Sequence, residues 1–370
     1  MNTIQIKKAL VTGGTGFLGR NFVRFLLDKG WEVTCLVREK SRYGHLTDMG
    51  VKIVFGDFFS KNALREAVNG MDFVFHLAAA TAAPSFEKML KINCEATENL
   101  LKVCVEQEKK PVFVYVSSLA AAGPSTPERP HEELDKCAPV SWYGKSKLFS
   151  ETILRTYADR LPITVIRPPM LFGPFDHEVR RWLTAIQKSG IFFIPFLRNF
   201  RFSLAHAEDV SSLLLLAAEK GERLPLMESD EAAEIFQILK TNPDRKLQTG
   251  ILAAEAGKGI YFVSQPETFT YVGLGKLFGK ALGRKFTLIL PLSPLLMHPA
   301  CFLMECVSKL TGTPCTLSKD KLREINAGSW SCTADKARKQ LGFENLHSLE
   351  EQCESTVEWM KNDQKKGQKK

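Results

Sequence analysis

Three features are missing from this sequence of 370 residues: paired cysteines, clustered histidines and a long apolar run. None of the nine cysteines forms a Cys-x-x-Cys pair, so no metal site is expected and the thiols are expected to be reduced. The longest apolar stretch, Ile289–Met304, is interrupted by Pro291, Pro294, Pro299 and His298 and falls short of the ~20 residues that span a bilayer. No charged-then-apolar leader opens the chain. We therefore expect a cytoplasmic protein, with peripheral membrane contact left open.

Acidic residues are outnumbered, with 41 Asp and Glu against 50 Lys and Arg, and the formal net charge is +9. A net +4 of this falls in residues 361–370, which hold five lysines and one aspartate and which we expect to form a disordered tail. The remaining excess is too small to indicate nucleic acid, and no such partner is expected. Hydrophobic residues at 44% and charged residues at 25% are typical of globular chains and exclude wholesale disorder.

Short β-branched runs alternate with amphipathic stretches through residues 1–175. Strands are expected at Lys8–Thr12, Glu32–Val37, Lys52–Phe55, Phe73–Leu77, Val112–Ser117 and Ile163–Arg167. Helices are expected at Asn21–Lys29, Lys61–Asn69, Lys88–Glu108 and Ser146–Arg160. Strands that alternate with helices form βαβ units, so the sequence predicts an α/β fold with a doubly wound parallel sheet.

The pattern loosens after Arg167, and residues 176–360 are expected to form mostly a second, smaller lobe. Two later segments, at about 203–220 and 258–265, are expected to return to the first domain. Residues 222–257 are polar and acidic and are interpreted as an insertion without an assigned role. Further elements are expected at Glu178–Ser189, Asp209–Glu219, Glu231–Leu239, Ile260–Val263 and Ser348–Trp359, the last with Ser348 as N-cap and Glu351 completing a capping box.

The turn after the first strand is rich in glycine and reads Gly13-Gly14-Thr15-Gly16-Phe17-Leu18-Gly19. Gly14, Gly16 and Gly19 fit G-x-G-x-x-G, and Gly13 with Gly16 and Gly19 fits a wider spacing. Glycine allows a tight turn and a close backbone approach, and the following helix N-terminus offers free N–H groups to a pyrophosphate. The strand–loop–helix context predicts a bound dinucleotide. The contacts are expected from Gly13, Thr15, Gly16, Phe17, Leu18 and Gly19.

The end of the second strand indicates which dinucleotide. A carboxylate there would bind the ribose 2′-OH of NAD, whereas an arginine accommodates the 2′-phosphate of NADP. The strand ends in Arg38, and Glu39 is the first acidic residue after it. The guanidinium of Arg38 can bind a phosphate, so NADP(H) is favoured over NAD(H).

Tyr143 and Lys147 are four residues apart, which places them on one face of a helix. A phenol with a pKa of about 10 is a poor proton donor or acceptor at neutral pH, and a nearby ammonium stabilises its phenolate. Ser118 follows a predicted parallel strand, at the edge where open α/β sheets place their sites. There it could hold a reacting oxygen close to Tyr143.

Several motifs together resemble the extended short-chain dehydrogenase/reductase family, and the match extends over nearly the whole chain. In chain order they are Thr12-Gly13-x-x-Gly16-x-x-Gly19, Gly56-Asp57, His76-Leu77-Ala78-Ala79, Ser117-Ser118, Tyr143-x-x-x-Lys147 and Arg167-Pro168 with Gly173-Pro174. The resemblance implies a Rossmann domain with a smaller C-terminal substrate-binding lobe.

The resemblance also implies roles for individual residues. It makes Ser118, Tyr143 and Lys147 catalytic, with Tyr143 and Lys147 also contacting the cofactor. It assigns Asp57 and Phe58 to the adenine, Leu77, Ala78 and Ala79 to the ribose side, and Pro168 to the neighbourhood of the nicotinamide. Asn93 corresponds to a helix asparagine that is structural or part of a proton relay. His206–Val210 is similar to a recurring segment that we interpret as structural.

Within the family, nucleotide-sugar dehydratases typically carry Thr-Asp-Glu where this chain has Ser118-Leu119-Ala120, and epimerases often have Ser-Ala-Thr. The stretch Thr34–Arg38 looks more like the 3β-hydroxysteroid dehydrogenase and dihydroflavonol reductase branch. We therefore expect an NADP-dependent oxidoreductase that interconverts a secondary alcohol and a ketone. A nucleotide-sugar epimerase or dehydratase is the alternative, and a non-catalytic NADP-binding scaffold or redox sensor is an alternative of another class.

Two interpretations of the small-molecule substrate stay open. The stretches Ile191–Phe196 and Leu288–Leu310 are rich in aromatic and aliphatic side chains. They suit a bulky, sterol- or flavonoid-like substrate, but such stretches also form cores or the contact of a homodimer. Arg180, Arg181 and Arg201 could instead bind the diphosphate of a nucleotide sugar.

Overall fold

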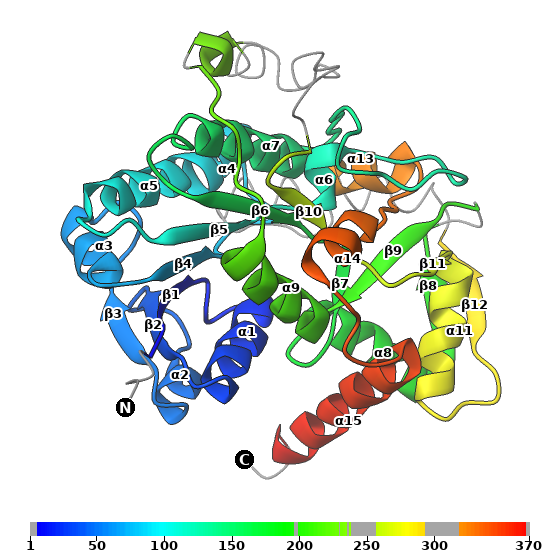
Figure 1. Ribbon diagram of the computed structural model, residues 1–370. Coiled ribbons are helices and arrows are strands. Elements are labelled where there is room, and N and C mark those ends of the chain that lie inside the picture. Colours follow the sequence, from blue (N-terminus) through cyan, green and yellow to red (C-terminus); the bar gives the residue numbers. More distant parts are fainter. Residues whose placement is uncertain are drawn as a thin grey trace.

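The computed structural model describes residues 6–195, 199–228, 230–234, 237, 257–292 and 318–367. At its centre lies a seven-stranded sheet with the order β10-β6-β5-β4-β1-β2-β3, in which every pair of neighbours is parallel (Figure 1). Its strands are β1 Lys8–Thr12, β2 Glu32–Val37, β3 Lys52–Phe55, β4 Phe73–His76, β5 Val112–Val116, β6 Ile163–Arg167 and β10 Ile260–Phe262. The predicted doubly wound parallel sheet is confirmed.

Helices cover both faces of this sheet because side chains alternate along its strands. In β1, Leu10 packs under the helices of one face, while Ala9 and Val11 pack against the helices of the other. The first face carries α3 Lys61–Val68, α5 Ala96–Glu106 and α7 Trp142–Arg155; the second carries α1 Phe17–Asp28, α9 Ala207–Lys220 and α14 Asp335–Leu341. The strand order reverses between β1 and β4, and ligands bind at the carboxyl edge of such a switch point.

A second lobe holds two smaller sheets with their own hydrophobic core. One sheet is mixed, with the order β11-β9-β7, and the other is a parallel pair of β12 and β8. The strands are β7 Met170–Phe172, β8 Ile191–Ile194, β9 Phe202–His206, β11 Thr268–Phe269 and β12 Leu288–Pro291, and the helices are α8 His177–Ser189, α11 Tyr271–Ala281, α13 Lys319–Ala327 and α15 Leu349–Gly367. α9 packs against α1 and β10 pairs with β6, so two late segments contribute to the half that holds the seven-stranded sheet. The domain boundaries given above stay a prediction.

Several helix bounds differ from those predicted. α7 begins at Trp142 rather than at residue 146, because the Ser141 hydroxyl accepts a hydrogen bond from the Gly144 N–H at 2.9 Å and caps the helix. It also ends at Arg155, before residue 160. The predicted helix 88–108 is a continuous run of α4 Phe86–Leu90, a π-helical turn η1 Lys91–Glu95, and α5. The short helices α2 Gly44–Asp48 and α6 Leu119–Ala122 were not predicted.

Parts of the insertion and of the apolar stretch lie outside the described residues. Of the predicted helix 231–239, residues 231–234 and 237 are described, and they are helical. Of the apolar stretch 288–310, residues 288–292 are described. Within the described ranges, no helix combines the length and the apolar character that crossing a membrane requires.

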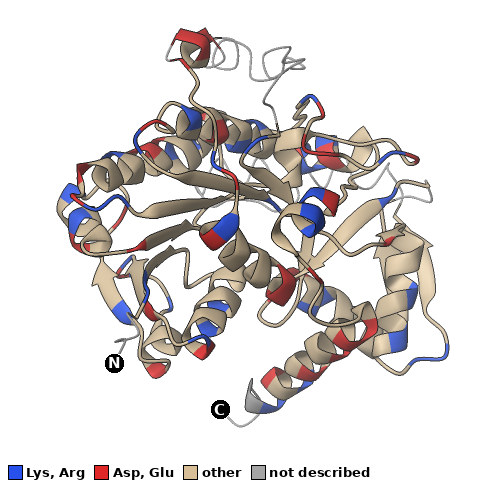
Figure 2. Cartoon of the chain, viewed as in Figure 1, with Lys and Arg blue, Asp and Glu red and all other residues tan. Residues whose placement is uncertain are grey.

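The C-terminal helix α15 carries acidic residues along its length and lysines toward its end, an order that matches the helix dipole (Figure 2). Its predicted capping box is confirmed: the Glu351 N–H donates to the Ser348 hydroxyl at 3.3 Å, and the Ser348 N–H donates to the Glu351 carboxylate at 2.9 Å. The helix therefore begins where the sequence predicts. It continues to Gly367, however, so the expectation of a disordered tail is wrong for residues 361–367, and residues 368–370 lie outside the described residues.

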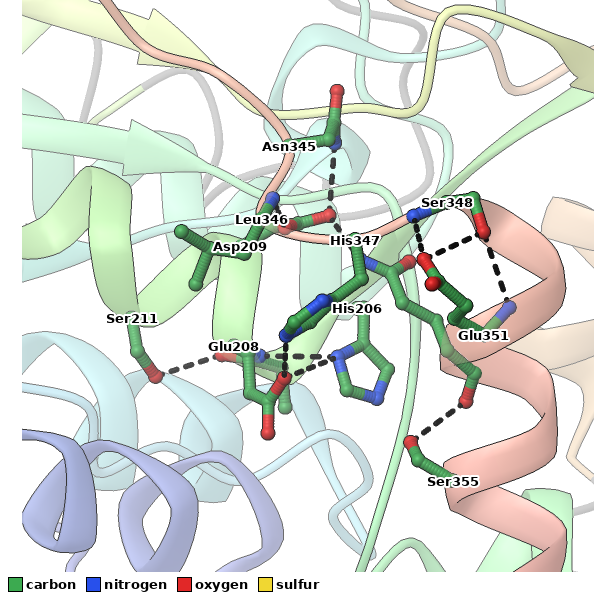
Figure 3. Close-up of polar contacts among 12 residues, drawn as sticks. His206, Glu208, Asp209, Ser211, Asn345, Leu346, His347, Ser348, Glu351 and Ser355 are labelled. Carbon is green, nitrogen blue, oxygen red and sulfur yellow. Dashed lines mark hydrogen bonds and ion pairs between the residues drawn. The ribbon is translucent and has the colours of Figure 1, made fainter.

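Asp209, at the start of α9, holds the segment that leads into α15 (Figure 3). Its fully buried carboxylate accepts hydrogen bonds from the Leu346 N–H and the Asn345 amide, each at 2.8 Å. The amides of Gln352 and Gln265 donate to it at 2.8 and 3.0 Å. Four donors thus satisfy one buried charge and connect α9 to the C-terminal segment.

Replacing Asp209 by Ala should lower the free energy of unfolding by about 2–4 kcal/mol, because four donors lose their acceptor, two of them the buried amides of Gln265 and Gln352. Replacing the exposed cap residue Ser348 by Ala should cost only about 1 kcal/mol. Urea unfolding of both variants, followed by circular dichroism, measures the two costs. Equal losses of unfolding free energy in the two variants would contradict the interpretation that Asp209 holds the segment before α15.

Candidate active site

The glycine loop between β1 and α1 is built from backbone in close contact. The Gly16 N–H donates to the Gly13 carbonyl at 2.9 Å, and a Cβ added at Gly19 would lie 2.1 Å from that carbonyl oxygen. Gly13 has φ +77°, and a Cβ there would lie 2.8 Å from the Ala78 nitrogen. Gly16 is exposed and is the N-cap of α1, whose first turn has no acidic residue and no side-chain cap. This geometry fits a pyrophosphate at the helix N-terminus.

The loop Leu77–Ala79 is held beside the glycine loop by buried polar residues. His76 lies between two hydroxyls, with Nδ1 2.7 Å from Thr12 Oγ1 and Nε2 2.9 Å from Thr97 Oγ1. Burial, reinforced by the charge of Lys147, lowers the pKa of His76 to about 3, so the ring stays neutral. His76 therefore acts as a structural link between β1, β4 and α5.

Asn93, in the π-helical turn, clamps the chain just after this loop. Its Oδ1 accepts from the Ala80 N–H at 2.8 Å, and its Nδ2 donates to the Ala80 carbonyl at 3.0 Å and to the Ser146 hydroxyl at 2.9 Å. Ser146 in turn donates to the Tyr143 carbonyl at 2.8 Å. Asn93 thus connects the segment after Leu77–Ala79 to the helix that carries Tyr143.

A surface cavity lies beyond the ends of β2 and β3. It is lined by Arg38, Glu39, Lys40, Ser41, Phe55, Gly56, Asp57 and Ser60. The structure therefore brings Arg38 and Asp57 together, with two further donors for a phosphate. Asp57 Oδ1 accepts from the N–H groups of Phe59 and Ser60 at 2.9 and 3.1 Å, and Phe58 packs edge-on against His76. Glu39 lines the same cavity, so a carboxylate is also within reach of a ribose.

Ser118 and Tyr143 meet at the carboxyl edge of the sheet. Ser118 ends the segment after β5 and is the N-cap of α6, accepting from the Ala120 N–H at 3.1 Å. Its hydroxyl is hydrogen-bonded to the hydroxyl of Tyr143, in the first turn of α7. Burial raises the pKa of Tyr143 to about 12, although this hydrogen bond acts in the opposite direction. The Leu119 N–H donates to the Pro168 carbonyl at 2.8 Å, which places Pro168 beside Ser118.

Lys147 is fully buried and its ammonium has other partners than the sequence predicts. Its Nζ donates to the Tyr115 hydroxyl at 3.1 Å and to the Val116 carbonyl at 2.7 Å. Burial lowers the pKa of Lys147 to about 7, and Glu151 opposes this shift. The end of β5 thus supplies two acceptors for the ammonium, and the stabilisation of the Tyr143 phenolate by Lys147 stays a prediction.

Sequence reasoning missed a buried ion pair beneath this site. Arg167 and Glu151 pair at 2.5 Å with side chains 2% and 3% exposed, and Ser117 Oγ donates to Glu151 Oε1 at 2.5 Å. Glu151 follows Lys147 by four residues, so it lies on the face of α7 that points to the sheet. The spacing of four residues from Lys147 was therefore the signal in the sequence that could have indicated Glu151. The pair ties the ends of β5 and β6 to α7.

The residues considered for the substrate are placed as follows. Phe192 and Ile194 are buried in the core of the second lobe, while Phe193 is 52% exposed, so the stretch 191–194 alternates as an ordinary strand. Arg180 pairs with Asp363 at 2.6 Å and Arg181 with Glu178 at 3.0 Å. Arg201 donates to the Thr268 hydroxyl at 3.4 Å. Two of the three arginines thus have carboxylate partners.

Comparisons with known proteins show the family to which the chain belongs. The model of the NAD-dependent epimerase/dehydratase family matches residues 9–228. The chain is 30% identical to a decarboxylating sterol-4-alpha-carboxylate 3-dehydrogenase of Dictyostelium discoideum, over 66% of this chain and 77% of that protein. It is 25% identical to a ceramide reductase of Caulobacter vibrioides, over 94% of this chain and 93% of that protein.

Among solved structures, the UDP-glucose 4-epimerase of Thermotoga maritima superposes with a TM-score of 0.71 at 20% identity, covering 96% of this chain and 99% of that chain. The dTDP-glucose 4,6-dehydratase of Bacillus anthracis gives a TM-score of 0.71 at 16% identity, covering 97% and 98%. At these identities the likeness concerns the fold alone. Because the family model matches more than half of the chain, this protein belongs to the NAD-dependent epimerase/dehydratase family of extended short-chain dehydrogenases/reductases, which are NAD(P)-dependent enzymes.

Proposed function

We propose that this protein is an NADP(H)-dependent oxidoreductase that interconverts a secondary alcohol and a ketone on a bulky, apolar substrate. The observation that carries the proposal is the hydrogen bond between Ser118 and Tyr143 at the carboxyl edge of the sheet, one helical turn from Lys147. A hydroxyl pair at that edge can bind and protonate a carbonyl oxygen.

The nicotinamide supplies or accepts the hydride at the substrate carbon when the cofactor is bound. In reduction, Ser118 holds the carbonyl oxygen by a hydrogen bond, and Tyr143 gives its phenolic proton to that oxygen. In oxidation the same proton returns from the alcohol to Tyr143. We assign Lys147 to the nicotinamide ribose and, through its charge, to the return of a proton to Tyr143.

The names of relatives support redox chemistry on lipid-like or ring-bearing substrates. Besides the sterol carboxylate dehydrogenase and the ceramide reductase, the chain is 30% identical over 57% of its length to a putative dihydroflavonol 4-reductase of a Synechocystis strain. The cavity with Arg38, Lys40 and Ser41 supports NADP(H), because it offers a guanidinium, an ammonium and a hydroxyl to a 2′-phosphate.

The alternative, a nucleotide-sugar epimerase or dehydratase, draws on a different relative. The chain is 31% identical, over 45% of its length, to a UDP-N-acetyl-alpha-D-glucosaminuronate decarboxylase of Bacillus cytotoxicus. Against it, Leu119 and Ala120 are apolar and buried where an additional acid or base would stand. The ion pairs of Arg180 and Arg181 also weaken a diphosphate site.

Replacing Tyr143 by Phe should lower kcat about 10²- to 10⁴-fold and leave the Kd for NADPH unchanged, because only the proton donor is lost. Turnover is followed by NADPH absorbance with hydroxysteroids, dihydroflavonol-like ketones and UDP-sugars as substrates. Tyr157→Phe is the control, since that hydroxyl bonds to Glu98, away from the site. A wild-type protein that binds NADPH but turns over none of these compounds would favour the scaffold or sensor.

Replacing Arg38 by Ala should raise KM for NADPH about ten- to a hundredfold and leave KM for NADH nearly unchanged, because one charge-assisted contact to the 2′-phosphate is lost. Arg42→Ala is the matched control, an arginine of the same loop that is not among the residues of this cavity. Equal KM values for the two cofactors in the wild-type protein would refute the NADP assignment. Glu39 would then be the residue to test for the ribose of NAD.

Replacing Gly13 by Ala should abolish NADPH binding, because the added Cβ would lie 2.8 Å from the backbone of Ala78 and separate the two cofactor loops. Gly30→Ala provides a matched control: its φ of +76° equals that of Gly13 within a degree, but its Cβ would meet nothing within 4 Å. Fluorescence titration with NADPH measures both. Equal losses would show that backbone strain, rather than the contact with Ala78, is responsible.

A further inference from the structure

The helix α13 belongs to the C-terminal part of the chain but docks on the first turn of α7 (Figure 1). Asp320 Oδ1 accepts a hydrogen bond from the Trp142 N–H at 2.7 Å, and Asp320 Oδ2 accepts from the Tyr143 N–H at 3.4 Å. Glu324 Oε1 accepts from the Ser141 hydroxyl at 2.7 Å. Three donors at the start of α7 are thus satisfied by two carboxylates that are 15% and 12% exposed.

The docked position of α13 is fixed by further contacts. Ser318 caps the helix by accepting from the Lys321 N–H at 3.2 Å, and Leu322 is buried. The Trp330 indole N–H donates to the Glu324 carbonyl at 2.9 Å. The buried Leu322 and the contact with Trp330 thus hold α13 in place, with its carboxylates toward α7.

Two opposite charges of α13 lie at the first turn of α7. Glu324 Oε1 accepts from Ser141, two residues before Tyr143, and Glu324 Oε2 lies 2.7 Å from Nζ of the half-exposed Lys321. Glu324 disfavours the phenolate and raises the pKa of Tyr143, whereas Lys321 favours the phenolate and lowers it, both effects being smaller than that of burial. Nothing in the chemistry proposed above uses these residues.

Other titratable groups around this point come from three more elements. Tyr115 of β5 interacts with Tyr143, and its hydroxyl accepts a hydrogen bond from the Lys147 ammonium of α7. Tyr271 of α11 interacts with Lys321 and Glu324. Arg323 lies 3.7 Å from Asp320, whose pKa burial raises to about 6. The charged groups around Tyr143 therefore come from α13 and, through Tyr115, from Lys147 of α7.

We propose that Asp320, Lys321 and Glu324 are positioning residues for Tyr143. Asp320 fixes the backbone at the start of α7, and the Lys321–Glu324 pair sets how readily the Tyr143 hydroxyl gives up its proton. The expected effect on kcat rests on the proposed function, in which Tyr143 is the proton donor. The expected effect of α13 on the pKa of Tyr143 is independent of that function.

Removing either charge of the Lys321–Glu324 pair should shift the pKa of Tyr143, in opposite directions for the two residues. Glu324→Gln keeps the acceptor for Ser141 but removes the negative charge, so the pKa of Tyr143 should fall by about 0.5–1 unit. Lys321→Met removes the positive charge, so the pKa should rise by about as much. The double variant should return close to the wild-type value. A structural defect in α13 would shift both single variants in the same direction.

The titration can be followed without any substrate. Fluorotyrosine lowers the phenol pKa and provides a ¹⁹F NMR signal for each of the six tyrosines of the chain. The signal that is lost in Tyr143→Phe identifies the residue. Lys339→Met, an exposed lysine on α14, is the control and should leave the titration unchanged. Unshifted or equally shifted signals in Glu324→Gln and Lys321→Met would overturn the proposal.

Activity gives the second measurement. In ketone reduction, the decline of kcat at high pH should move to lower pH in Glu324→Gln and to higher pH in Lys321→Met. Asp320→Ala should lower kcat about tenfold with KM for NADPH unchanged, and Asp320→Asn, which keeps an acceptor for the Trp142 N–H, should recover most of it. The pKa of Tyr143 could shift in opposite directions in Glu324→Gln and Lys321→Met while the wild-type protein turns over no substrate. That outcome would refute the oxidoreductase function but retain the effect of α13 on Tyr143. Full kcat in Asp320→Ala would refute the positioning role of Asp320.

Discussion

The contact between the backbone at Gly13 and the backbone at Ala78 is the one on which the site depends. It forms because β1 and β4 are neighbours in the sheet, at the point where the strand order reverses. From there a polar connection continues through Ala80 and Asn93 to Ser146, and so to α7. The spacing of two backbones, which leaves no room for a side chain, therefore positions the glycine loop, the loop Leu77–Ala79 and helix α7 together.

A buried ion pair is the second feature that fixes the elements around Ser118 and Tyr143. The Arg167–Glu151 pair lies at the carboxyl edge of the sheet, almost without access to water. Such a pair adds little net stability, because desolvation offsets most of the attraction, but it tolerates only one arrangement of its partners. Here the partners are the ends of two strands and the middle of α7. The pair is better understood as fixing the relative position of these elements than as strengthening the fold.

The parallel sheet could be predicted because its signals are local: β-branched strands, helices between them, and a glycine turn after the first strand. The meeting of Ser118 and Tyr143 followed from the topology once the strands were placed. The partners of Lys147 and the contacts of Asp320 could not be predicted, since Asp320 lies 178 residues from Trp142 in the sequence. The start of α7 was misplaced because one cap, Ser141, outweighs the pattern of the residues that follow.

The π-helical turn at Lys91–Glu95 limits which changes of sequence this helix can accept. A π turn holds one residue more than a regular turn and leaves the helix less well bonded there. Losing that residue would restore a regular helix but rotate Asn93 relative to α5 by roughly 100°. The clamp on Ala80 would then be broken. The irregular turn therefore lowers the stability of the helix but keeps the segment at Ala80 in place, and a change that favours one of these properties acts against the other.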